Sequence, residues 1–315
     1  MNRLFKFSGA GNDFVVLDGR QGGVEACRDA ATIGQLCREY HTDGLMILDT
    51  ADGYDFAMEF FNPDGSGGMM CGNGGRCIVA FADYLGIKPA DGAVYRFLAP
   101  DGPHTAQILT TSGEGLISGS GSSPAKPCHN ACIEDSVGKI PGTKTDLPQK
   151  TWTVKLKMID VEGVEPTMNG YFLNTGTRHY VEFVPDVNAM DMEKEARPIR
   201  WDKAFQPEGT NVNFVQVTPE GLLVRTFEKG VEGETLACGT GLTASAIAAS
   251  YHSPGAMRPR GAGALGPQSV EDNTTLETVS YRLQCRRGDW LQVEFKKQGR
   301  LYTDVYLTGP AELVK

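Results

Sequence analysis

Apolar and polar residues alternate over many short segments of the chain, which is typical of half-buried β-strands. We expect strands at 3–7, 14–18, 55–62, 94–99, 151–161, 171–174, 179–184, 213–217, 222–228, 290–295 and 301–309. Apolar residues at helical spacing are fewer and predict helices over 31–40, with Thr32 near its start, 75–86, and 240 to the residue before Pro254. Many strands and few helices predict a mixed, largely antiparallel α+β protein.

Two long segments interrupt this pattern. Residues 112–150 and 252–275 are rich in Gly, Pro, Ser and Thr. Such composition favours loops, so we expect both segments to be surface insertions.

The chain contains an internal repeat. The segment EFFNPDGSGGMMCGNG (59–74) aligns without gaps on TFEKGVEGETLACGTG (226–241), so that Cys71 matches Cys238. Upstream, GNDFVV from Gly11 resembles GTRHYV from Gly176, and the spacing from glycine to cysteine is similar in both copies. Two matches in the same order predict two similar domains, each presenting one cysteine at the start of a helix.

The repeat also suggests where the domains divide. We expect the N-terminal half to comprise residues 1–162 together with 308–315, including the first insertion. The C-terminal half would comprise residues 163–307, including the second insertion. Each half would be a mostly antiparallel sheet wrapped around a central helix.

Cysteine at a helix N-terminus has a specific chemical advantage. Unpaired backbone N–H groups and the helix dipole stabilise a thiolate there, and they lower a thiol pKa of about 8.5 to about 3.5–7.5. The glycines after Cys71 and Cys238 leave those N–H groups open to a carboxylate. Two thiols facing one another across a cleft would suit inversion of a stereocentre, because one takes a proton and the other returns one from the opposite face.

A structural role is the competing interpretation of each cysteine. Either thiol taken alone would more often be a small buried side chain. Their repeated C-G-x-G context favours catalysis, whereas Cys77 falls among apolar helical neighbours and is expected to be structural.

Composition and charge narrow the function classes. The chain has 315 residues, 40% of them hydrophobic, and a net charge of −9, so we expect no nucleic-acid or anionic-membrane partner. It has no apolar run of 18 residues and no secretory N-terminus, so its eight cysteines are expected to be reduced thiols in the cytoplasm. The pair in CHNAC (128–132) lacks a second ligand pair nearby, so we expect no metal. Dinucleotide and phosphate-loop motifs are absent, so we expect no cofactor.

The longest motifs together resemble the diaminopimelate epimerase family. They are GAGNDFVVLD, FNPDGSGGMMCGNGGRC and ETLACGTGLTASA, and the resemblance covers nearly the whole chain outside the two insertions. It implies a small-molecule substrate, diaminopimelate, whose LL and meso forms are interconverted at one α-carbon without pyridoxal phosphate. The product of that family feeds lysine synthesis and, in many bacteria, peptidoglycan.

The resemblance also implies roles for individual residues. Cys71 and Cys238 would be the acid and base thiols. His179 and Glu228 would tune their pKa values. The expected substrate-binding residues are Asn12, Asn62, Gly72, Asn73, Thr177, Asn211, Glu228, Lys229, Gly239 and Thr240.

This chain departs from the family pattern at the distal end of the substrate. Thr177-Arg178-His179 replaces the usual Asn-Pro-His, Lys229 replaces Arg, and Gly44 stands where some members have Gln. Lysine offers a point charge where arginine would grip a carboxylate with two hydrogen bonds. Arg178 is a candidate to replace part of the lost contact.

Three alternatives stay open. One is a proline or hydroxyproline racemase-type enzyme of the same fold, and another is a thiol–disulfide redox protein. A third is a binding protein without turnover. A homodimer is also left open.

Overall fold

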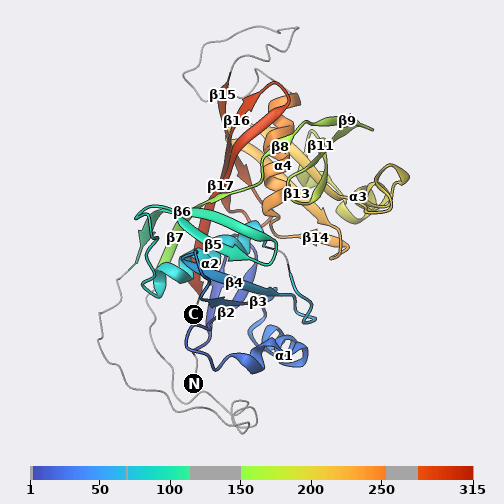
Figure 1. The fold of residues 1–315 in the computed structure, drawn as a ribbon. Helices are drawn as coiled ribbons and strands as arrows, with labels where there is room; N and C mark the ends of the chain where they lie inside the picture. The colour runs from blue at the N-terminus through green and yellow to red at the C-terminus, as the bar shows by residue number, and fades with distance from the viewer. Residues whose placement is uncertain (1–2, 69, 114–149, 253–275, 315) are drawn as a thin grey trace.

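The computed structural model describes residues 3–68, 70–113, 150–252 and 276–314. The CHNAC segment and nearly all of both expected insertions lie outside these ranges. Figure 1 shows two halves, the N-terminal strands gathered around one helix and the later strands around another. None of the helices in the described ranges is long and apolar enough to cross a membrane.

The N-terminal half is a closed ring of strands. Its members are β1 (Phe5–Ser8), β2 (Asp13–Asp18), β3 (Gly44–Asp49), β4 (Phe56–Phe61), β5 (Tyr95–Ala99), β6 (Gly102–Ser112), β7 (Lys150–Lys157) and the end of β17 (Leu301–Val314). Each strand pairs with the next, and β17 closes the ring by pairing with both β7 and β1. The β2–β3 and β4–β5 pairs are parallel and the others are antiparallel.

The C-terminal half repeats this order. Its ring contains β8 (Val161–Glu162) with β9 (Glu165–Thr167), β10 (Gly170–Asn174), β11 (Arg178–Phe183), β12 (Asn211–Thr218), β13 (Gly221–Glu228), β15 (Glu277–Gln284), β16 (Trp290–Gln298) and the start of β17. Parallel pairs recur at the equivalent places, β11–β12 and β13–β15. The short β14 (Gly233–Thr235) adds to β13.

The matching strand orders confirm the predicted fold class, an α+β protein with two pseudo-symmetric halves. The strand β17 belongs to both rings and is seen running through both halves in Figure 1. The exact domain limits stay a prediction.

A buried helix fills each ring. They are α2 (Gly72–Tyr84) and α4 (Gly239–His252). Both are buried on nearly every side, as expected for helices that lack a polar face. In α2, the ring of Phe81 packs against Phe5 and Phe7 at centroid distances of 5.2 and 5.6 Å. The central helices therefore supply the core of each half.

Shorter helices cover the outside of the sheets. The helix α1 (Ala30–Tyr40) packs on β2 and β3, and α3 (Met192–Arg200) packs on β12 and β13. The 3-10 turns are η1 (Glu25–Arg28), η3 (Val187–Ala189) and η4 (Lys203–Phe205). Thr32 lies near the start of α1 as expected, but the cap is Asp29, whose carboxylate accepts a hydrogen bond from the Thr32 amide at 3.1 Å.

Several elements were not among the predicted ones. The strand β3 lies between α1 and α2, so both its faces are buried and its sequence does not alternate. Few residues of β6 are buried, which leaves little apolar pattern. The helix α3 contains Pro198 and buries only one face.

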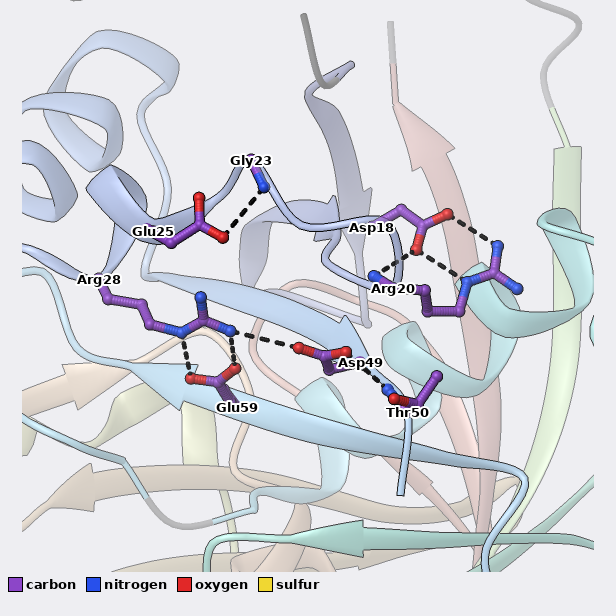
Figure 2. A network of polar contacts seen from close by, with 8 residues as sticks. All are labelled: Asp18, Arg20, Gly23, Glu25, Arg28, Asp49, Thr50 and Glu59. Atoms are coloured by element: carbon purple, nitrogen blue, oxygen red, sulfur yellow. Dashed lines mark hydrogen bonds and ion pairs between the residues drawn. The ribbon is translucent and has the colours of Figure 1, made fainter. Parts of the chain in front are cut away.

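Ion pairs fasten η1 to the sheet, as Figure 2 shows. The Arg28 guanidinium donates two hydrogen bonds to Glu59 on β4, one of them at 2.8 Å, and a third to Asp49 at 3.4 Å. Their side chains are about one third exposed, so solvent screens the attraction.

Phe81→Ala should lower the free energy of unfolding by about 3–5 kcal/mol, because it leaves a cavity inside the N-terminal ring. Urea denaturation measures the loss. Glu59→Gln is the matched control and should cost at most about 1 kcal/mol, since that pair is about one third exposed and screened by solvent. Equal losses in the two variants would contradict this account of the core.

Candidate active site

The two central helices meet at their N-termini. A Cβ added to Gly72 would lie 3.3 Å from the Gly239 Cα, and one added to Gly239 would lie 3.1 Å from the Gly72 Cα. Leu307 of β17 crowds the same positions, with its Cδ2 at 2.9 and 3.1 Å. A side chain at either position would therefore require the facing helix start and Leu307 to shift. The contact brings two helix starts, each with a partial positive charge, to one place.

Cys71 immediately precedes α2 and caps it. Its extended backbone lets the carbonyl accept the first helical hydrogen bond, from the Gly75 amide at 2.8 Å. The Sγ accepts a second hydrogen bond from the Gly74 amide at 3.2 Å. Burial raises the pKa of the Cys71 thiol and the Glu228 carboxylate raises it further, while the Gly74 amide opposes them.

Cys238 occupies the equivalent position before α4. Its carbonyl accepts from the Leu242 amide at 2.9 Å, and its Sγ lies 3.4 Å from the Thr240 Oγ1. Burial and then the charge of Glu228 hold the pKa of this thiol well above its ordinary value, against the hydrogen bond with Thr240. The two cysteines are thus alike in backbone position, and they differ in the side-chain hydroxyl that is close to Cys238.

Glu228 ends β13 and lies beside both thiols. The Thr235 hydroxyl donates to its Oε1 at 2.5 Å. Burial raises the pKa of this carboxyl, and hydrogen bonds with Thr235 and Cys238 oppose the rise. Because its charge affects the pKa of Cys71 as well as that of Cys238, one carboxylate serves both cysteine segments.

His179 lies behind Cys238 and is fully buried. Its Nε2 is 2.9 Å from the Thr177 Oγ1 and 3.0 Å from the Thr240 Oγ1. Burial lowers the pKa of His179 to about 3, so the imidazole is neutral at ordinary pH. Two threonines thereby connect His179 to the sulfur of Cys238.

Asn73 links the two halves next to the helix contact. Its Nδ2 donates to the Asn12 Oδ1 at 2.6 Å and to the Ala237 carbonyl at 3.4 Å. Its Oδ1 accepts from Arg76 at 2.9 Å. Asn12 belongs to the N-terminal half and Ala237 to the C-terminal half, so this amide helps to set the relative position of the two halves.

The expected distal residues also lie together. The Asn211 Nδ2 donates to the Arg178 carbonyl at 3.1 Å and to the Thr177 Oγ1 at 3.3 Å, and its Oδ1 accepts from the Lys229 amide at 2.8 Å. The side chains of Arg178 and Lys229 both contact Glu208. Arg178 forms an ion pair with the Glu208 carboxylate at 2.5 Å. The Lys229 Nζ donates a hydrogen bond to the Glu208 backbone carbonyl at 2.8 Å.

Two other positions have local explanations. Asn62 lies in the turn after β4, where its Nδ2 donates to the Ser66 Oγ at 3.0 Å rather than to another candidate residue. A Cβ at Gly44 would lie 2.6 Å from the Phe60 ring and 2.8 Å from the Phe61 carbonyl. Glutamine at position 44 would therefore require these neighbours to move.

Arg76 and Asn213 were missed by the sequence argument. Arg76 is fully buried, and its hydrogen bonds reach the carbonyls of Gly72, Gly9 and Pro310 in addition to Asn73, none of them a carboxylate. Asn213 is also fully buried and bonds to the His179 Nδ1 at 3.0 Å. The sequence did contain a signal for each of them, because Arg76 is a charged residue in an apolar helix and Asn213 is a polar residue in an apolar strand.

Within the described ranges, no three His, Cys, Asp or Glu side chains are grouped so that they could hold a metal ion.

Comparison with known proteins identifies the family. The family model for diaminopimelate epimerase matches residues 4–118 and 171–260. A diaminopimelate epimerase from Flavobacterium psychrophilum is 33% identical, with 99% of this chain and 98% of that protein covered. One from Chlorobaculum tepidum is 35% identical, with coverages of 98% and 97%.

Solved structures share the fold at low identity. A phenazine biosynthesis protein of the PhzF family from Bacillus anthracis has a TM-score of 0.58 at 12% identity, covering 99% of this chain and 96% of that one. A hydroxyproline epimerase from Agrobacterium vitis has a TM-score of 0.54 at 14% identity, with coverages of 99% and 89%. These structures show the fold alone. The family model and the relatives match in sequence, and they show that this chain belongs to the diaminopimelate epimerase family.

Proposed function

We propose that this protein interconverts LL- and meso-2,6-diaminopimelate by proton transfer at one α-carbon, with Cys71 and Cys238 as the base and acid. The observation that supports this proposal is the contact of Gly72 with Gly239, which brings together two helix starts that each follow a cysteine. Membership of the diaminopimelate epimerase family supplies the substrate. The product would feed lysine and peptidoglycan precursor synthesis in the cytoplasm.

The α-carboxylate of the substrate would bind between the two helix N-termini. Backbone amides of Gly72 and Asn73 on one side, and of Gly239 and Thr240 on the other, are the expected donors. Two facing helix starts attract an anion strongly, because each contributes about half a positive charge. The same donors would stabilise the negative charge that spreads onto this carboxylate when the α-proton leaves.

Inversion then needs one proton removed and one supplied. A thiolate on one face takes the α-proton and becomes a thiol, and the planar carbanion receives a proton from the thiol on the opposite face, which becomes a thiolate. The enzyme gains and loses no net proton, and the roles exchange in the reverse direction. Glu228 would accept a hydrogen bond from the α-ammonium.

The surroundings of the two sulfurs indicate which ionises first. In Cys71 the sulfur accepts directly from a backbone amide. The charge of Glu228 opposes ionisation of both thiols, but at Cys238 a hydrogen bond with Glu228 adds to it and the pKa is held well above normal. We therefore assign Cys71 as the thiolate of the free enzyme and Cys238 as its thiol.

The distal end of the substrate would contact Asn12, Asn62, Thr177, Asn211 and Lys229. Asn211 bonds to both Thr177 and the Lys229 backbone, which supports a shared subsite. The Arg178 side chain is engaged by Glu208, so recruiting it for the substrate would require that ion pair to open.

The racemase-type and redox alternatives differ from this proposal in the substrate and in the working state of the two cysteines. The fold likeness to a hydroxyproline epimerase covers the whole chain but carries no substrate information. A redox protein would use the Cys71–Cys238 disulfide as a working state, whereas in an epimerase that disulfide would be inactive.

The reduced protein, incubated in deuterated water with LL-diaminopimelate, should give meso product labelled at a single α-carbon. Mass spectrometry locates the label. Cys71→Ala and Cys238→Ala should each abolish inversion, because each removes one of the two proton carriers. Proline and 4-hydroxyproline should stay unchanged. Turnover of either in place of diaminopimelate, or activity that requires an oxidant, would favour an alternative function.

Gly72→Ala should lower kcat/KM by about 10²-fold, because a Cβ there would push the two helix starts apart and misplace the donors. Steady-state kinetics measures the effect. Gly67→Ala is the matched control, since a Cβ at that glycine meets nothing within 4 Å. Equal activity of the two variants would argue against a functional role for the contact.

In the free enzyme, iodoacetamide should modify Cys71 faster than Cys238 across neutral pH. The pKa of both thiols is raised, so both rates increase with pH, and the Cys71 rate should increase first. Peptide mass spectrometry measures both rates in one sample. Faster modification of Cys238 would reverse the assignment of the resting thiolate.

A further inference from the structure

We propose that Asn213 is a positioning residue that fixes the tautomer of His179 and thereby directs the Thr240 hydroxyl hydrogen onto the Cys238 sulfur. This inference deepens the proposed function, since it assigns a role in setting the state of one proposed acid/base thiol. It rests on a chain of hydrogen bonds that begins in the core of the C-terminal ring and ends at the sulfur.

The orientation of the Asn213 amide is determined by the Tyr180 carbonyl, which has a single role. Its Nδ2 donates to the Tyr180 carbonyl at 2.9 Å, and a carbonyl can only accept. Its Oδ1 accepts from the Thr226 hydroxyl at 2.9 Å. The second Nδ2 hydrogen is therefore the one that faces the His179 Nδ1 at 3.0 Å.

This contact decides which ring nitrogen of His179 carries the proton. Because Asn213 donates to Nδ1, Nδ1 must present a lone pair. A neutral imidazole then carries its hydrogen on Nε2, and the ring is neutral because it is fully buried. His179 is consequently a donor toward the two threonines and accepts nothing from them.

The hydroxyl of Thr177 is then saturated as an acceptor. It receives the His179 Nε2–H at 2.9 Å and the Asn211 Nδ2–H at 3.3 Å, which fills both of its lone pairs. The Asn211 amide is itself oriented by the Arg178 carbonyl and the Lys229 amide. Among protein acceptors, the Thr240 Oγ1, 3.0 Å away, is the one available to the Thr177 hydrogen.

Among the protein atoms that contact the Thr240 Oγ1, the acceptor left for its hydrogen is the Cys238 Sγ at 3.4 Å. Hydrogen bonds donated to sulfur favour the thiolate, and those to a charged acceptor are the stronger ones. With the other tautomer, a lone pair on Nε2 would compete with the sulfur for this hydrogen. Asn213 therefore acts on Cys238 through His179 and Thr240, without touching the sulfur.

Gly241 makes room for this arrangement. A Cβ at Gly241 would lie 2.5 Å from the Asn213 Oδ1 and 3.2 Å from the Thr226 Oγ1. The second glycine of the C-G-T-G segment thus has a role of its own, which is to let the helix pass over the Asn213 amide.

The first test is the tautomer of His179 in the unmodified protein. Two-bond nitrogen–carbon correlation spectra of histidine-labelled protein should show Nε2 protonated and Nδ1 unprotonated from about pH 5 to about pH 9. His179→Gln identifies the signals of this ring by their loss. A protonated Nδ1 in the unmodified protein would overturn the proposal, whether or not any variant folds.

The second test follows the effect to the sulfur without using substrate. Thr240→Val should shift the pH profile of Cys238 alkylation upward by about one pKa unit, which is about tenfold in rate at neutral pH. Thr240→Ser, which keeps the hydroxyl, should restore the original profile. Cys71 in the same sample is the internal control and should not shift.

Asn213→Asp should place the proton on Nδ1, because a carboxylate can only accept, and should shift the Cys238 profile upward as well. Part of that shift should disappear in the Asn213→Asp/Thr240→Val double variant, since the path runs through the hydroxyl. A fully additive shift would mean that position 213 acts by charge alone and would overturn the proposal. None of these measurements depends on the identity of the substrate, so they succeed or fail independently of the proposed reaction.

Discussion

The arrangement of the site depends on the direct contact between two helix N-termini at Gly72 and Gly239. Two like partial charges this close repel one another, so the approach must be imposed by the rest of the fold. The strand rings and the shared strand β17, which places Leu307 against both glycines, provide that constraint. An anion between the helix starts would relieve the repulsion, which makes this point suited to a carboxylate.

Burial sets the chemistry around that contact. Both thiols and the Glu228 carboxyl have raised pKa values because water is excluded from them. Arg76 is a buried cation near these acids. Its guanidinium is fully buried, and its hydrogen-bond partners are carbonyl oxygens. Such a charge is costly unless a negative group lies nearby. Because Arg76 bonds to the Gly72 carbonyl, its charge lies directly behind the proposed carboxylate-binding amides and offsets the cost of bringing an anion there.

Much of this could be predicted from sequence because the internal repeat preserves local signals. The alignment of Cys71 on Cys238 predicted two related halves, and the strands with clear alternation were found where expected. What failed were features created by tertiary contact. The strand β3 does not alternate because helices cover both faces, and the meeting of Gly72 with Gly239 joins segments far apart in the chain. Asn213 could be recognised only once its neighbours across the sheet were known, since its partners lie on β11 and β13.

The two halves are similar in fold and different in chemistry. A backbone amide acts on each sulfur, but the Cys238 sulfur also has a side-chain hydroxyl at the end of a hydrogen-bond chain. Under the proposed mechanism this difference is useful, because a two-thiol inversion requires one thiolate and one thiol in the enzyme before and after the transfer. Two identical environments would bind the proton equally and leave its position unassigned. The backbone amide is a fixed donor to Cys71, whereas the Thr240 hydroxyl is directed onto the Cys238 sulfur by the groups that donate to it. The half that carries His179 and Asn213 is thus the one whose proton affinity is set by a chain of side chains, and the pseudo-symmetric fold holds it opposite a backbone donor.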